Sequence, residues 1–87
     1  MTEVITASGF AVDIDEAVLD DIELLDMLME TSKDNVRHLP AILGKLLGEE
    51  GKRRLYEHVR TPEGRVPYGA IDRELTEIFS AVNGGKN

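Results

Sequence analysis

Apolar residues at the start of the chain follow a spacing of two. Phe10, Val12 and Ile14 lie two positions apart, and an earlier apolar group precedes the pair Ser8–Gly9. Alternation is typical of a strand with one buried face, and Ser-Gly has the composition of a tight turn. The sequence therefore predicts two short strands within residues 1–15. They must pack on other elements or pair with a partner, because an isolated two-stranded ribbon is marginally stable in water.

From residue 16 the apolar spacing becomes that of an amphipathic helix. The stripe is formed by Val18, Ile22, Leu25 and Met29, which are four, three and four positions apart, and Leu28 widens it. Acidic residues occupy the first turns, where carboxylates interact favourably with the helix dipole. The pattern predicts a helix over residues 16–30, before the polar break at residues 31–35.

Three further helices are predicted in the rest of the chain. The apolar block at residues 39–48 has Pro40 where a first turn tolerates proline and Gly48 where a helix can end. Residues 49–60 begin acidic and end basic, which is the order that the helix dipole favours. A last helix opens at Pro67 and carries the clearest apolar stripe, formed by Tyr68, Ile71, Leu75, Ile78, Phe79 and Val82.

These patterns predict a mainly α fold, with a short N-terminal β-strand pair followed by about four short helices in one compact domain over residues 1–87. The strands are expected within residues 1–15, the helices within 16–82, and a flexible tail at 83–87. A chain of 87 residues has room for one core. With no Trp, two Phe and two Tyr, that core is expected to be aliphatic.

Composition argues against several classes of function. The chain has no Cys, so a disulfide framework, a thiolate metal site and a cysteine nucleophile are all excluded. It has 10 Lys and Arg against 17 Asp and Glu, and the net charge of -7 repels phosphate backbones and anionic membranes. The sequence shows neither a signal-peptide pattern nor a membrane span. We therefore expect no nucleic-acid or membrane ligand and no cofactor.

Charge is unevenly distributed along the chain. Residues 1–34 hold ten acidic side chains against one basic residue, Lys33, whereas the remainder holds nine basic and seven acidic residues. Two regions of opposite potential could attract each other within one chain, between copies of the chain, or towards a basic partner. A homo-oligomer therefore stays open as an interpretation.

No residue pattern supplies a catalytic or metal site. The run that starts at Asp13 begins like a calcium loop, but Val18 stands where that motif needs glycine. His38 and His58 are the only imidazoles, and their spacing does not place two metal ligands on one helix face. We expect a protein that is not an enzyme. The basic cluster Lys52–Arg54 is interpreted either as a charge-balanced helix end or as a docking point for an acidic partner.

Several segments together carry a resemblance to a known family. They are Ala7–Asp15, Leu19–Leu25, Leu39–Glu50, Arg54–Arg60, Gly64–Pro67 and Glu77–Phe79. In their order, and over nearly the whole chain, they resemble the small tail assembly chaperones of long-tailed bacteriophages and prophages, which are encoded just upstream of the tape measure protein. The resemblance is one of pattern, since none of these segments is a catalytic signature.

This resemblance implies a non-enzymatic late protein of the host cytoplasm that is absent from the finished particle. Such a chaperone binds the long, aggregation-prone tape measure protein, keeps it soluble and helps to deliver it to the tail tube protein of the growing tail. Members of the family are often also made in a longer, frameshifted form. The run Gly84–Lys86 could be encoded by a slippery sequence, although ordinary codons explain three residues equally well.

A contact surface can be predicted from the aliphatic helices and the acids beside them. A groove between short helices could hold an amphipathic segment of the tape measure protein, while net charge keeps the complex dispersed. The residues expected there are Ile22, Leu25, Met29, Leu43 and Leu46, with Asp20 and Asp21 at the rim. The competing interpretation is that these apolar side chains simply form the core.

Two other functions stay open at this point. The acidic N-terminal third would suit a regulatory protein that mimics nucleic acid and binds a basic host protein. The chain could also be a minor structural component of a phage particle.

Overall fold

The computed structural model describes residues 1–84 and begins with the expected strand pair. Strand β1, Thr2–Ile5, pairs antiparallel with β2, Ala11–Ile14, so that Val4 lies opposite Val12. The turn between the strands contains Gly9 at φ 93°, a conformation that glycine adopts without strain. The prediction of a short N-terminal strand pair is confirmed.

The predicted helix over residues 16–30 is divided into two pieces. A 3₁₀ turn, η1, spans Glu16–Asp20, and helix α1 spans Ile22–Glu30. Asp21 separates them because its backbone is extended, at φ -125° and ψ 110°, and its side chain accepts hydrogen bonds from the amides of residues 23 and 24. An aspartate that caps a helix in this way stands outside it.

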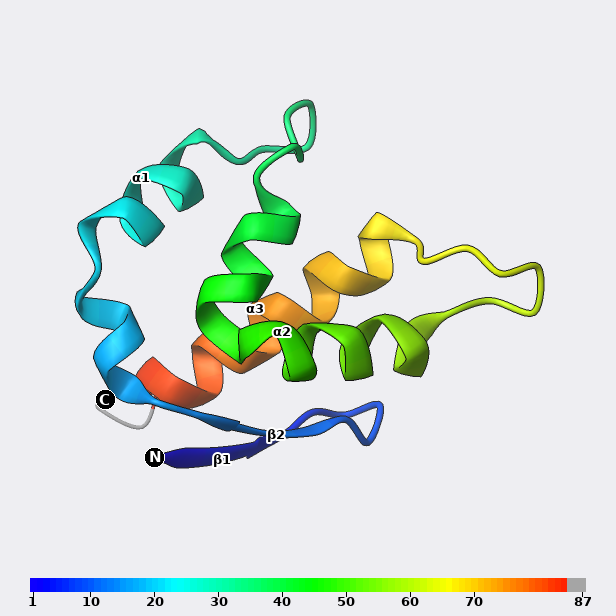
Figure 1. The fold of residues 1–87 in the computed structure, drawn as a ribbon, viewed down its shortest axis with the longest axis horizontal. Coiled ribbons are helices and arrows are strands. Elements are labelled where there is room, and N and C mark those ends of the chain that lie inside the picture. The colour runs from blue at the N-terminus through cyan, green and yellow to red at the C-terminus, as the bar shows by residue number, and fades with distance from the viewer. Residues whose placement is uncertain (85–87) are drawn as a thin grey trace.

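The remaining helices are α2, Leu39–Val59, and α3, Tyr68–Gly84. The two predicted helices at 39–48 and 49–60 are joined in α2, which bends sharply at Gly48 (Figure 1). Within residues 1–84 the structure thus has three α-helices, and the prediction of about four is corrected by this junction. Of the predicted tail at 83–87, residues 85–87 lie outside the described part of the chain.

The bend in α2 depends on glycine. Gly48 has φ 76° and ψ 167°, a region that side chains other than glycine rarely enter. Three residues later, Gly51 is buried, and a Cβ there would lie 2.9 Å from Cβ of Leu47 and 3.7 Å from a methyl carbon of Val12. The bend divides α2 into a first arm, residues 39–47, and a second arm, residues 49–59. Because Gly51 lies so near Val12, the second arm lies close to the sheet.

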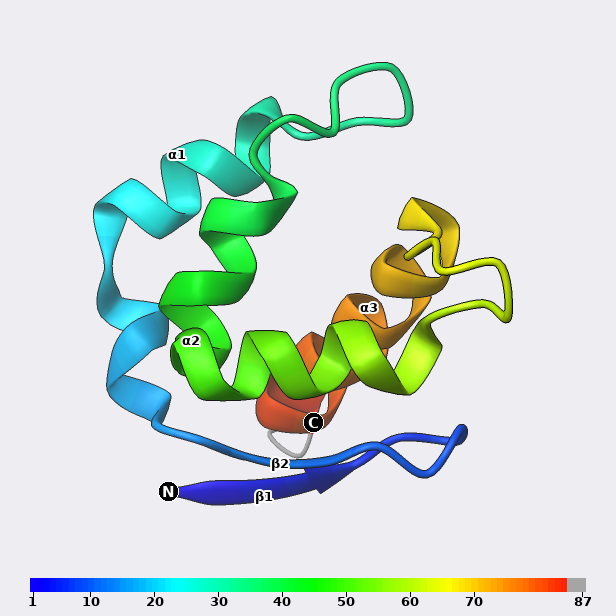
Figure 2. The same ribbon diagram turned by 45° about the vertical axis from the view of Figure 1, so that its right-hand side comes forward.

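The core lies between the sheet and the helices. Figure 2 shows both strands along one side of the molecule, with the second arm of α2 and α3 over them and α1 beside the first arm of α2. Contacts join β2 to α2, β1 to α3, and α1 to α2. The side chains with the least exposure come from every layer and are Ile14, Leu24, Ile42, Leu43, Leu55 and Ile78. The buried core residues are aliphatic, apart from Phe10.

In the part of the chain that the structure describes, none of the helices has the length and apolar character needed to cross a membrane.

Candidate functional site

The most unusual surface feature is a row of exposed apolar side chains on α1. Ile22, Leu25 and Met29 are 68%, 49% and 78% exposed, and their spacing of three and four places them on one face of the helix. We call these three residues the α1 ridge. The adjoining face of α1 packs inward through Leu24, which is 2% exposed, and Leu28, which is partly buried. Helix α1 therefore has apolar residues on two faces, and only one of them is covered.

Two hollows adjoin the centre of this ridge, and both are lined by Leu19 and Leu25. The apolar hollow has a volume of about 220 Å³, and its other lining residues are Leu24, Leu28 and Phe79. The acidic hollow has a volume of about 270 Å³, and its other lining residues are Asp20, Asp21 and Ile22. Ridges and hollows of this kind are what a docked helix requires, because its side chains insert between those of its partner.

The predicted contact set is divided between surface and core. Ile22, Leu25 and Met29 are exposed as a contact surface requires, whereas Leu43 and Leu46 are 1% and 3% exposed. Leu43 and Leu46 lie on the first arm of α2 and belong to the core. For these two leucines the core interpretation is the one that the structure supports, because both are buried away from the exposed ridge residues.

The two predicted rim acids differ in their surroundings. Asp21 accepts hydrogen bonds from the amides of Glu23 and Leu24 and from the Lys45 ammonium, whose nitrogen lies 3.0 Å from Asp21 Oδ2. The hydrogen bond from Lys45 holds the pKa of Asp21 below its ordinary value, and the same contact raises the pKa of Lys45. Asp20 is exposed and has no hydrogen-bond or ion-pair partner among residues 1–84.

Half of the ten acids in residues 1–34 are engaged within the fold. Asp15 caps η1 and Asp21 caps α1. Glu16 accepts a hydrogen bond from the Thr2 hydroxyl. Glu23 lies in ion-pair contact with Lys45, and Glu30 with His38. The carboxylates without a partner among the described residues are those of Glu3, Asp13, Asp20, Asp26 and Asp34. The acidic character of the N-terminal third thus serves local structure as well as surface charge.

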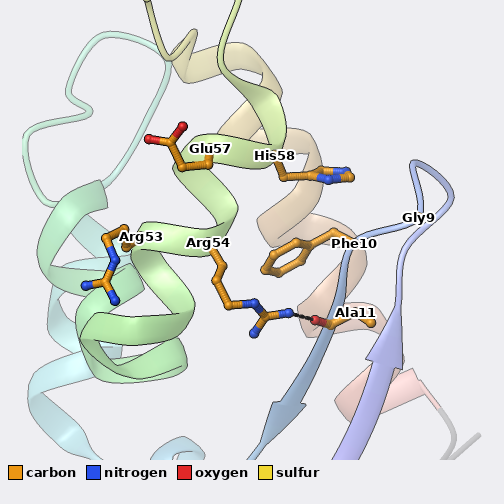
Figure 3. A pocket seen from close by; sticks show the side chains of 7 residues that line it. All are labelled: Gly9, Phe10, Ala11, Arg53, Arg54, Glu57 and His58. Carbon is orange, nitrogen blue, oxygen red and sulfur yellow. Dashed lines mark hydrogen bonds between the residues drawn. The ribbon is translucent and has the colours of Figure 1, made fainter.

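A separate depression, of about 550 Å³, lies where the hairpin meets the second arm of α2. Figure 3 shows Phe10 and Gly9 from the hairpin facing Arg54 and His58 from α2. The guanidinium carbon of Arg54 lies 5.2 Å from the ring centroid of Phe10, and Arg54 donates a hydrogen bond to the carbonyl of Ala11. Arg54 therefore ties α2 to β2 through a cation–π contact and a hydrogen bond.

The basic cluster of α2 is largely neutralised by its own helix. Lys52 pairs with Glu49 and Arg53 with Glu50, each three residues apart. Since Arg54 bonds to Ala11, the cluster is arranged as a charge-balanced helix segment rather than as a free docking point for an acidic partner.

A polar network that sequence reasoning missed fastens the hairpin turn to both long helices. Ser8 Oγ donates to Oε2 of Glu74 at 2.7 Å and lies 2.9 Å from Nε2 of His58. Glu74 is 4% exposed, and its Oε1 has no partner within the described residues. The sequence position of Glu74 indicates its burial, because Glu74 stands three residues after Ile71 and four before Ile78 and so lies inside the apolar stripe of α3.

This network does not have the geometry of an activated serine. The single hydroxyl proton of Ser8 is given to Glu74, so His58 Nε2–H must be the donor to Ser8 Oγ. A catalytic base would instead accept that proton. His38 lies in another part of the molecule, where its Nε2 is 2.7 Å from Glu30. The two histidines therefore share no site.

Among residues 1–84, no cluster of three or more His, Asp or Glu side chains is arranged to hold a metal ion. No protein-family model, no curated protein and no solved structure matches this chain.

Proposed function

We propose that this protein is a phage tail assembly chaperone that binds and solubilises the tape measure protein during tail assembly, without catalysing a reaction. The observation that carries the proposal is the α1 ridge. Isolated exposed apolar residues are ordinary, but three on one helix face, with two hollows that the central Leu25 lines, form a surface suited to another apolar helix face.

The charge of the protein supports a holding role. An exposed apolar surface favours self-aggregation of both chaperone and client, and like charge opposes it. The net charge is -7, and Asp20, Glu23 and Asp26 lie within two positions of a ridge residue in sequence. A complex with a long helical client would carry this charge and stay dispersed.

The proposal can be tested by co-expression with a tape measure protein fragment from the same phage or prophage. We expect a larger soluble yield of the fragment and co-purification of the two chains. Leu25→Ser should abolish both effects, because it places a hydroxyl between the two hollows. Ile5→Ser is the matched control, since Ile5 is 66% exposed but lies on β1, away from the ridge. A fragment that stays insoluble with the wild-type chain would contradict the proposal.

The alternative of an acidic regulator or nucleic-acid mimic has less support, because half of the acids in residues 1–34 are engaged within the fold. Salt separates the two functions. Binding of a mimic to a basic protein should weaken steeply with ionic strength, whereas apolar docking should change little. A minor structural component would instead be found in purified particles.

A further inference from the structure

The two hollows beside Leu25 differ in chemistry. The apolar hollow is lined by the side chains of four leucines and Phe79, so it suits an aliphatic or aromatic side chain. The acidic hollow combines the apolar side chains of Leu19, Ile22 and Leu25 with two aspartates. A surface with this pairing of hollows would select its partner by charge as well as by apolar character.

Only one of the two aspartates in the acidic hollow is available to a partner. Asp21 is bound to Lys45 and to two amides of α1. Asp20 is exposed at the end of η1 and has no partner among residues 1–84. A ligand group in this hollow would therefore meet the apolar side chains of Leu19, Ile22 and Leu25 and one free carboxylate, that of Asp20.

Lysine and arginine have this combination of properties. Their methylene stems pack on apolar surface while the charged head reaches a polar group. A carboxylate in the same position would be repelled by Asp20, and a purely apolar side chain would leave that carboxylate partly desolvated without a partner. The hollow is thus complementary in charge to a cationic side chain.

We propose that the α1 ridge recognises an amphipathic helical segment of another protein, in which an apolar residue enters the apolar hollow and a Lys or Arg enters the acidic hollow, paired with Asp20. The two hollows adjoin each other because they share Leu19 and Leu25. Side chains three or four positions apart on a helix are neighbours, at about 5–6 Å between Cβ atoms, and suit adjacent hollows. This inference rests on the proposed function and specifies the chemistry of the client segment.

The test uses stapled, fluorescein-labelled helical peptides and the full chain, with binding followed by fluorescence anisotropy. The first peptide carries Leu and Lys four positions apart. The second has norleucine in place of Lys, which keeps the stem and removes the charge, and the third has Glu. We expect the Lys peptide to bind about three- to tenfold more tightly than the norleucine peptide at low salt, and the Glu peptide to bind most weakly.

Asp20→Asn should remove the preference for Lys over norleucine. Asp26→Asn is the matched control, because it also removes one negative charge, on α1 instead of η1, and Asp26 lines neither hollow. It should leave most of the preference in place. Thermal melts should agree among the three proteins, since neither aspartate has a partner within the described residues.

The possible results separate this inference from the proposed function. Equal binding of the Lys and norleucine peptides, or an unchanged preference in Asp20→Asn, overturns the charge selection while leaving the apolar docking intact. If no peptide binds, or if Leu25→Ser does not weaken binding, the ridge is not the docking surface and this inference fails, whatever the co-expression experiment shows. Self-association of the wild-type chain that Leu25→Ser abolishes would identify a second copy as the occupant and would also overturn it.

Discussion

The bend of α2 leads to a prediction in which two glycine substitutions have opposite effects. Gly48 has φ 76° and ψ 167°, and a Cβ added there meets nothing within 4 Å. The cost of Gly48→Ala is therefore a backbone cost alone, of about 1–3 kcal/mol for a residue in this region. Lower entropy of the unfolded chain offsets about 0.4–1 kcal/mol of it. We expect a net loss of about 1–2 kcal/mol in the free energy of unfolding.

Gly69 provides the matched control. It lies in the first turn of α3, has no positive φ, and an added Cβ there also meets nothing within 4 Å. Gly69→Ala should therefore stabilise the protein by about 0.5–1 kcal/mol, through helix propensity.

Thermal unfolding followed by circular dichroism would measure both changes. For a domain of this size each kcal/mol shifts Tm by about 4–8 °C, so Gly48→Ala should melt clearly below the wild type and Gly69→Ala above it. A Gly48→Ala protein that melts at or above the wild-type temperature would refute the reasoning, because it would mean that the positive φ at the bend is not required in solution.

Three further predictions concern single side chains. Leu24→Ala should cost about 2–5 kcal/mol of stability, because it leaves a cavity at a buried position. Leu25→Ala should change stability by less than about 0.5 kcal/mol and weaken client binding, because Leu25 is exposed. Urea unfolding would measure the stability of each variant, and fluorescence anisotropy would measure its binding. Because the pKa of Asp21 is lowered in the folded state, the ionised carboxylate stabilises the fold above the ordinary pKa of 3.8, and this stabilisation is lost as the pH falls below that value. The urea midpoint of Asp21→Asn should therefore fall less than that of the wild type between neutral and acidic pH. Ser8→Ala should cost about 1–3 kcal/mol because it leaves the buried carboxylate of Glu74 without a hydrogen bond, and adding Glu74→Met should restore most of the thermal stability.

Hydrophobic periodicity predicts the elements whose secondary structure depends on residues close together in the sequence. The strand pair follows from alternation around Ser8–Gly9, and α3 follows from its regular stripe after Pro67. The predicted helix boundaries differ from the structure at one cap and one bend. The pattern places Asp21 in the first turns of a helix, whereas in the structure it is the N-cap of α1. The pattern also places a helix end at Gly48, where φ and ψ are indeed non-helical, but the two helical segments on either side are joined as one bent helix, α2. In both cases the residue type indicates an interruption of the helix, but it does not show whether a helix begins, ends or bends at that residue.

The candidate site was predictable in composition but not in orientation. The spacing predicts one stripe through Ile22, Leu25 and Met29, with Leu28 beside it. In the structure those three residues are exposed, whereas Leu28 is partly buried and packs inward with Leu24. Periodicity shows that residues share a face and does not show which of two apolar faces is covered. Leu43 and Leu46 had the same appearance in the sequence, and they are buried because the first arm of α2 lies in the middle of the fold.

The sequence by itself determined the fold class, the aliphatic character of the core and the uneven charge, because these depend on composition and on spacing along the chain. Only the tertiary structure decided which apolar residues stay exposed and which carboxylates stay unpaired. Asp20 and Asp21 are neighbours of the same type, yet Lys45, twenty-four positions further along, reaches Asp21 and not Asp20. Contacts between residues so far apart in the sequence depend on how the helices pack, and the local sequence pattern does not show that packing.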